Sequence, residues 1–197
     1  MNENLRTSKA GSDLITKWES CVLHQYFCPA GKPTIGIGHV VLPGEKFPPT
    51  ITREFAEQLL ANDLLHFERA IYQRIKVPLT QHQFDALVCF IYNVGEGGLF
   101  SAKNGETGVC RAVNEGRTQD VPKALAAWSK AVVNGQLTVL PGLLNRRKSE
   151  GELFLTPDDG VQTVTQLPES VAWTKDSLKA AQTKLKALGL YGIAVDG

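Results

Sequence analysis

The residues of this sequence that could do chemistry are concentrated in the stretch KWESCVLHQYFCPAGKPTIGIGH, residues 17–39. It holds Glu19 near the end of an expected helix, followed by the thiol of Cys28 and the hydroxyl of Thr34. Glu19 follows Trp18 and an apolar helical face, and a carboxyl in such surroundings has a raised pKa and can serve as a general acid. A lone glutamate at a helix end is more often a surface residue, so Glu19 by itself leaves both interpretations open.

Other arrangements in the same stretch fit known chemistry less well. Residues 36–38, Gly-Ile-Gly, lack the third glycine and the strand–helix context of a dinucleotide-binding loop, so they predict a tight turn. Cys28 and His24 could suggest a thiol nucleophile with its base, but residues four apart on a strand are separated by roughly 13 Å. The four histidines show no metal-ligand spacing and no C-x-x-C pair occurs, so we expect neither a metal site nor a cofactor.

The composition is that of an ordinary globular protein. Of the 197 residues, 43% are hydrophobic and 21% are charged, which is enough apolar surface for a packed core. The formal net charge is +1, from 21 basic and 20 acidic residues, which argues against a nucleic-acid binder. The sequence has no apolar run of about 18 residues, so no membrane-spanning helix is expected. The first 20 residues lack the pattern of a secretory signal. Four irregularly spaced cysteines predict no disulfide scaffold and indicate a reducing cytoplasm.

The elements that must position Glu19 and Thr34 follow from hydrophobic periodicity. A helix is expected over residues 12–18, with Ser12 or Asp13 as its N-cap, and it ends close to Glu19. Short β-prone runs separated by proline and glycine then predict a small antiparallel sheet, with strands over 22–27, 34–37 and 40–42.

The rest of the chain is predicted to be mainly helical. The longest helix runs over 52–75, with Thr52 as its N-cap and one apolar face. Thr80 and Gln83 form a capping-box pattern at the start of a second helix, which is apolar around most of its surface and ends at Gly95. The other expected segments are a flexible glycine-rich stretch over 95–108, a short helix near Asp120 and helices over 142–155 and 175–188.

The spacing of Glu19, Cys28 and Thr34 resembles the catalytic signature of phage-type lysozymes, glycoside hydrolase family 24. That signature has a Glu, eight residues, an Asp or Cys, five residues, and a Thr that opens a T-I-G-x-G-H turn; residues 34–39 read TIGIGH. Residues 59–64, 81–95 and 140–155 are similar to further family segments, in the family's order. The resemblance covers residues 7–155 and identifies the chain as a member of this family.

The resemblance implies catalytic roles for three residues. Glu19 would be the general acid that protonates the glycosidic oxygen, and Thr34 would help to place the attacking water. Cys28 would occupy the position that the family usually fills with an aspartate.

The resemblance also implies residues that bind substrate or support the site. Asn93 and Gly38 would line the saccharide cleft. Arg146 would pair with Glu19 and hold its orientation. His39 and Asp63 would form a structural pair that links the sheet to the long helix.

The fold that the resemblance implies is an α+β lysozyme, mainly helical, in which the long helix joins a small antiparallel sheet lobe to a helical lobe. We expect residues 1–155 to form the muramidase domain, 156–172 a linker, and 173–197 a partial peptidoglycan-binding repeat. The expected substrate is peptidoglycan, cleaved by a monomer at the β-1,4 bond between N-acetylmuramic acid and N-acetylglucosamine. No nucleic acid and no membrane insertion are expected.

Cys28 leaves the mechanism open, because a free thiol has a pKa near 8.5 and only a few per cent is thiolate at pH 7. The thiolate could act as base or nucleophile, or the neutral thiol could place water with Thr34. Glu19 could also act alone, as in lytic transglycosylases, although the presence of Thr34 favours hydrolysis. A rival class is a non-catalytic peptidoglycan-binding module.

The expected setting is that of an endolysin, made in the host cytoplasm without a signal peptide and acting on peptidoglycan in the periplasm. A secreted effector or a tail-associated lysozyme fits the same residues.

Overall fold

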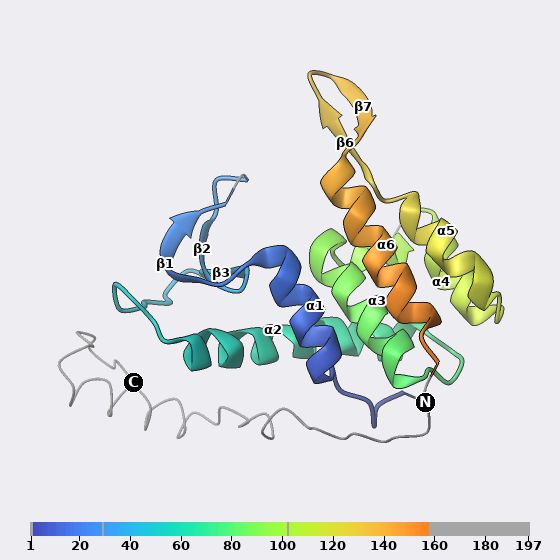
Figure 1. Ribbon diagram of the computed structural model, residues 1–197, viewed down its shortest axis with the longest axis horizontal. Coiled ribbons are helices and arrows are strands. Elements are labelled where there is room, and N and C mark those ends of the chain that lie inside the picture. The colour runs from blue at the N-terminus through green and yellow to red at the C-terminus, as the bar shows by residue number, and fades with distance from the viewer. Residues whose placement is uncertain (1, 29, 102, 158–197) are drawn as a thin grey trace. The chain divides into compact units, whose positions relative to one another are not determined.

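The computed structural model describes residues 2–28, 30–101 and 103–157 (Figure 1). Within them, six α-helices and short antiparallel strand pairs form an α+β arrangement in which helices predominate, as predicted. The described chain divides into two compact units, one of residues 19–62 and one of residues 2–18 with 63–157. No described helix is long and apolar enough to cross a membrane. The predicted helix over 175–188 and the repeat over 173–197 lie outside the described residues, as does most of the linker.

The smaller unit carries a three-stranded antiparallel sheet of β1 (Val22–Phe27), β2 (Pro33–Gly36) and β3 (His39–Val40), in that order. The first strand has its predicted bounds, while the other two begin one residue early and end sooner. Gly36 ends β2 with a φ of +69°, a left-handed conformation that glycine adopts without cost. A Cβ at Gly36 would also lie 3.3 Å from the Cβ of Ala56, so the turn packs closely on helix α2 (Arg53–Arg74), which contains Ala56.

Helix α1 (Lys9–Glu19) begins one turn earlier than predicted. The expected N-caps, Ser12 and Asp13, lie inside the helix, and the Ser8 hydroxyl instead accepts a hydrogen bond from the Ala10 N–H at 3.1 Å. Gly11 allows this first turn to pack closely, because a Cβ there would lie 2.9 Å from Asp85. The first turn is thus held by close packing, which hydrophobic periodicity does not reveal.

Helix α2 (Arg53–Arg74) confirms the long helix and its cap, since the Thr52 hydroxyl accepts a hydrogen bond from the Phe55 N–H at 3.2 Å. Its buried apolar residues are Ala56, Leu60, Leu64, Ala70 and Ile71. The helix contributes residues to both units.

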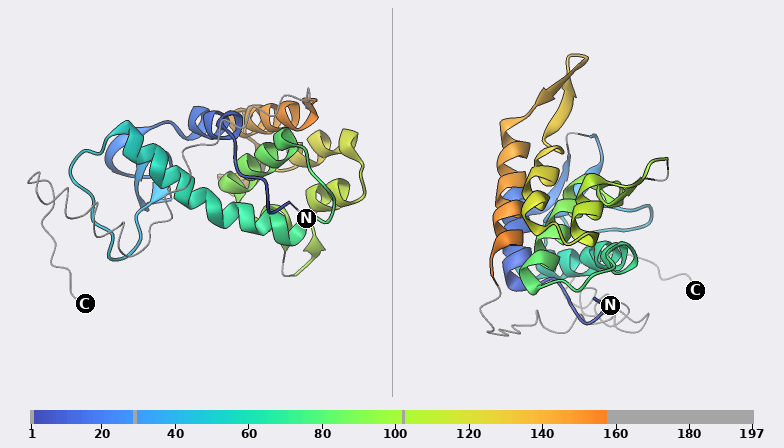
Figure 2. Two further views of the ribbon diagram at one scale, coloured as in Figure 1. Left: turned by 90° about the horizontal axis from the view of Figure 1, so that it is seen from below. Right: turned by 90° about the vertical axis from the view of Figure 1, so that its right-hand side faces the viewer.

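Helix α3 (Gln81–Val94) is the centre of the helical unit. The capping box of Thr80 and Gln83 is present, and the helix ends at Gly95, as predicted. All eight residues from 84 to 91 are buried, which agrees with the apolar character of the whole helix surface. Helix α6 (Pro141–Leu155) packs against α3 and against the short helix α5 (Val121–Ala126), which in turn packs on α4 (Gly108–Asn114) (Figures 1 and 2).

Two strand pairs were not predicted. The glycine-rich stretch over 95–108 is not a flexible loop: it forms a 3-10 turn (Glu96–Gly98) and the strand pair β4 (Phe100–Ser101) and β5 (Gly105–Glu106). Further along, β6 (Lys130–Val133) and β7 (Gln136–Val139) form a hairpin that projects beyond the start of α6 (Figure 1). Its two-residue turn, Asn134-Gly135, has φ values of +50° and +80°.

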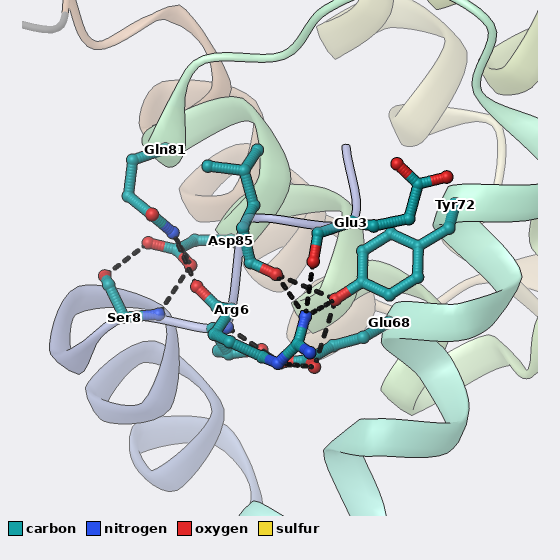
Figure 3. Close-up of polar contacts among 9 residues, drawn as sticks. Glu3, Arg6, Ser8, Glu68, Tyr72, Gln81 and Asp85 are labelled. Carbon is teal, nitrogen blue, oxygen red and sulfur yellow. Dashed lines mark hydrogen bonds and ion pairs between the residues drawn. The ribbon is translucent and has the colours of Figure 1, made fainter. Parts of the chain in front are cut away.

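Buried carboxylates hold the N-terminal segment against α2 and α3 (Figure 3). Asp85 accepts hydrogen bonds from the Ser8 N–H at 2.8 Å, from the Ser8 hydroxyl and from the Gln81 amide. Glu68 accepts two from the N–H and hydroxyl of Thr7, both at 2.8 Å. Burial raises the pKa of Asp85, although these hydrogen bonds lower it in part.

Candidate active site

Glu19 is the last residue of α1 and is half-buried. The next residue, Ser20, has a φ of +63°, a left-handed conformation that costs a non-glycine residue about 1–2 kcal/mol. This residue turns the chain from α1 into β1, so the Glu19 carboxyl is carried at the junction of helix and sheet.

Cys28 and Thr34 meet across a tight turn between β1 and β2. The turn is closed by the Cys28 N–H, which donates to the Lys32 carbonyl at 2.9 Å, and by the Gly31 N–H, which donates to the Cys28 carbonyl at 2.8 Å. Hydrogen bonds from the backbone of Lys32 and Ala30 and from the Thr34 hydroxyl lower the pKa of the Cys28 thiol, and the Lys32 charge adds to the effect.

The Thr34 hydroxyl is therefore shared between two acceptors. Thr34 is buried, and its Oγ1 lies 3.1 Å from the Lys32 carbonyl as well as within hydrogen-bond reach of Cys28. A hydroxyl has one proton to donate, so ionisation of Cys28 and donation to Lys32 compete for it.

Tyr26 is a further residue of the candidate site, and it was not predicted from the sequence. It is the cross-strand partner of Thr34, so the two side chains lie on the same face of the sheet. Burial raises the pKa of Tyr26, and the negative charges of Glu19 and Cys28 raise it further. Glu19, Tyr26 and Cys28 are thus electrostatic neighbours, and the phenol stays protonated beside them at neutral pH. Tyrosine is common in β-strands, so a tyrosine at this position gave no sign of a role in the site.

The TIGIGH turn supports β3 and the loop that follows. Gly38 has a φ of +77°. His39 is buried, and its Nε2 lies 3.0 Å from Glu45 Oε2 while its ring packs edge-on against Phe47. The predicted pair of His39 and Asp63 joins residues of the two units and stays a prediction, as does the pair of Glu19 and Arg146.

The helical unit holds a second cluster, formed where α6 packs on α3. Asn93 Oδ1 accepts a hydrogen bond from Arg147 Nη2 at 3.1 Å. The same nitrogen donates to Glu150 Oε1 at 2.7 Å, and both of these charged side chains are fully buried. Burial lowers the pKa of Arg147 and raises that of Glu150, while their mutual attraction opposes both changes.

Arg146, named in the sequence analysis, belongs to this cluster. Its Nε lies 3.3 Å from Glu150 Oε1, and its Nη2 donates to the Cys89 carbonyl at 3.4 Å. The sequence placed Arg146 and Arg147 side by side without indicating which would contact Asn93, because that contact depends on how α6 packs.

The arrangement around β1 and β2 suits acid–base chemistry. It combines a half-buried carboxyl, a thiol whose pKa is lowered, and a buried hydroxyl. Among the described residues, no group of three or more His, Cys, Asp or Glu side chains could hold a metal ion.

Comparison with known proteins gives consistent relatives. A family model described as phage lysozyme matches residues 16–150. An endolysin of Acyrthosiphon pisum secondary endosymbiont phage 1 is 35% identical over 76% of this chain and 98% of its own length. A SAR-endolysin of Pseudomonas phage phiKMV is 35% identical over 80% of this chain and 94% of its own. The solved muramidase domain of SpmX from Asticaccaulis excentricus is 39% identical, with a TM-score of 0.69 over 78% of this chain and 100% of that domain.

Proposed function

The chain belongs to the phage lysozyme family and is a peptidoglycan hydrolase, and we propose that it cleaves the β-1,4 bond between N-acetylmuramic acid and N-acetylglucosamine by the chemistry of glycoside hydrolase family 24. Its substrate is bacterial cell-wall peptidoglycan, which we propose it meets in the periplasm as a monomer. The muramidase relative supports this choice of bond.

We assign the general acid to Glu19. Its carboxyl protonates the glycosidic oxygen as the bond to the leaving sugar breaks, which requires the protonated form at the start of the reaction. Its half-buried place at the end of α1 supports this role.

Cys28 and Thr34 act on the water. The observation that carries this assignment is the set of donors on the Cys28 sulfur, from Lys32, Ala30 and Thr34, because they favour the thiolate over the thiol. The thiolate takes a proton from a water that the Thr34 hydroxyl helps to place, and the resulting hydroxide equivalent attacks the anomeric carbon. Asn93 and Gly38 line the saccharide cleft, while Arg146, His39 and Asp63 support the site.

The test is a zymogram on purified peptidoglycan with wild type and Glu19→Gln. The amide cannot donate a proton as the carboxylic acid does, so we expect cleavage to fall by at least about 100-fold. Asp13→Asn, an exposed position on the same helix, is the matched control and should clear the gel like wild type. A Glu19→Gln variant with normal clearing would remove Glu19 from the mechanism.

Mass spectrometry of the products identifies the reaction. Hydrolysis leaves N-acetylmuramic acid at each new reducing end and N-acetylglucosamine at each new non-reducing end, and we expect these ends alone. Anhydro-muramic ends would contradict hydrolysis and indicate that Glu19 acts without an attacking water.

A further inference from the structure

Asn93 lies one residue before the end of α3, and its side chain is exposed. The amide oxygen of this side chain is nevertheless held in place, because Oδ1 accepts a hydrogen bond from Arg147 Nη2 at 3.1 Å. An exposed amide is thus bonded through its oxygen to a fully buried guanidinium.

Arg147 is itself held in place. Its Nη2 donates to Glu150 Oε1 at 2.7 Å, and its guanidinium carbon lies 5.0 Å from the centre of the Phe90 ring. Glu150 is fixed in turn by Arg146 and by the Cys89 thiol, whose sulfur lies 3.5 Å from Oε1. The guanidinium therefore has little freedom to follow a rotating amide.

This geometry determines which way the Asn93 amide points. A guanidinium carries only donors, so the amide must turn its oxygen toward Arg147. The reversed amide would set two N–H groups against each other and leave the second hydrogen of Arg147 Nη2 without the acceptor it has now, since the first is bonded to Glu150. The Asn93 NH2 is therefore the group left to face outward.

We propose that Arg147 is a positioning residue that makes Asn93 a hydrogen-bond donor toward the substrate, and that Asn93 recognises an amide carbonyl oxygen, that of a sugar acetamido group. This inference rests on the proposed function, in which Asn93 lines the saccharide cleft. Sugar hydroxyls both donate and accept, so they do not require a donor at this position. An acetamido carbonyl only accepts, and it is present on both sugars of the glycan backbone.

The decisive variant is Asn93→Asp, which keeps an oxygen toward Arg147 and replaces the outward donor by an acceptor. On N-acetylated peptidoglycan we expect kcat/KM to fall by about 10-fold or more, through KM, because a donor is replaced by a repelling oxygen. On the same peptidoglycan after chemical de-N-acetylation, the wild type should lose its advantage, because the carboxylate can accept from the new ammonium groups. Asn145→Asp, an exposed position on α6 with the same charge change, should match wild type on both substrates.

Arg147→Lys tests the positioning step. Lysine keeps the charge but not the planar array of donors, so the ratio of kcat/KM between N-acetylated and de-N-acetylated substrate should fall toward one. A merely structural role would lower the unfolding temperature and leave that ratio at its wild-type value, which would overturn the role of Arg147. If Arg147→Lys does not fold, Asn93→Asp still decides the donor.

The remaining outcomes separate the hypotheses. Peptidoglycan freed of its stem peptides should show the same loss for Asn93→Asp, and a loss confined to peptide-bearing substrate would overturn the acetamido assignment. Equal kcat/KM for Asn93→Asp and wild type would overturn the inference alone. Failure of both wild type and Asn145→Asp to release sugars from N-acetylated peptidoglycan would overturn the proposed function.

Discussion

At the scale of single residues, the chemistry that we propose depends on the hydrogen-bond donors around the Cys28 sulfur. Cys28 receives hydrogen bonds from two backbone N–H groups and from Thr34, and these stabilise the thiolate without a neighbouring histidine. A thiol held in this way can stand where a second carboxyl would be expected in a glycosidase, because hydrogen bonds that lower its pKa favour the anionic form.

Alkylation of Cys28 by iodoacetamide should therefore reach half its maximal rate at a lower pH than for an ordinary thiol. Thr34→Val removes one donor from the thiolate, so its midpoint should move to higher pH. Rates are read by mass spectrometry on the peptide that contains Cys28. Burial raises the pKa of Cys89 and raises that of Cys110 to about 11, so these two thiols serve as unreactive internal controls. Equal midpoints for Thr34→Val and wild type would contradict the assignment.

The sequence predicted some site residues and missed others for a physical reason. Glu19, Cys28 and Thr34 lie on one continuous stretch, so their spacing along the chain could be matched to the family's catalytic signature. The contact of Asn93 with Arg147 joins residues more than 50 positions apart, and it appears only once α6 lies against α3. Tyr26 required the strand register that pairs it with Thr34.

At the scale of elements, the backbone conformation at the end of α1 determines where the Glu19 carboxyl lies. Ser20 has a left-handed conformation directly after Glu19, and it directs the chain from helix into sheet. Any residue at this position must accept that conformation, or the carboxyl before it moves.

Ser20→Val should lower the free energy of unfolding by about 1–2 kcal/mol and also reduce the rate of peptidoglycan cleavage, because a β-branched residue resists positive φ. Ser20→Gly should be close to wild type in both, since relief of the strain offsets the entropy that glycine loses on folding. Urea unfolding and zymogram rates give the two measurements. Thr16→Val, within the same helix, is the control for a new valine and should keep full activity. Equal behaviour of Ser20→Val and Ser20→Gly would contradict this account.

The long helices were predicted from sequence, while the strand pairs β4–β5 and β6–β7 and the short helix α4 were not. The helices over 53–74 and 81–94 each combine such a period with a capping residue at the start. The hairpin over 130–139 has an Asn-Gly turn between β-prone runs, which is the sequence pattern typical of a two-residue hairpin turn. Helix α4 is only seven residues long and starts at a glycine, so no apolar period marks it.

At the scale of the whole molecule, the N-terminal segment joins residues far apart in the chain. Ser8 and Asp85 are 77 positions apart, and Asn2 donates to Val77 while accepting from the Leu79 N–H. Buried charge at Asp85 makes this anchoring sensitive to pH. Because burial raises the pKa of Asp85 above its value of 3.8 in the unfolded chain, the folded state holds a proton more tightly than the unfolded one. The stability that this residue contributes is therefore greatest at low pH and is lost as pH rises through the folded pKa.

Asparagine does not ionise, so Asp85→Asn should not lose stability as Asp85 does when the pH rises. The free energy of unfolding of Asp85→Asn, relative to that of wild type, should therefore increase between pH 4 and pH 7. The amide can still accept from the Ser8 N–H, which keeps the segment in place. Asp85→Ala removes the acceptor altogether and should cost about 1–3 kcal/mol at both pH values. Urea unfolding at the two pH values gives the comparison, and the difference between variants cancels the titration of other groups. A pH-independent difference between Asp85→Asn and wild type would show that Asp85 carries no such linkage.

The projecting hairpin has a practical consequence for anyone who works with this chain. Its turn residues, Asn134 and Gly135, are exposed, and both strands beside them are exposed over residues 132–139. A peptide inserted between these two residues would displace no buried side chain, and doubling a loop costs only about 0.6 kcal/mol. The tip is therefore the natural place to attach an affinity tag, a fluorophore or a wall-targeting peptide while residues 19–39 stay untouched.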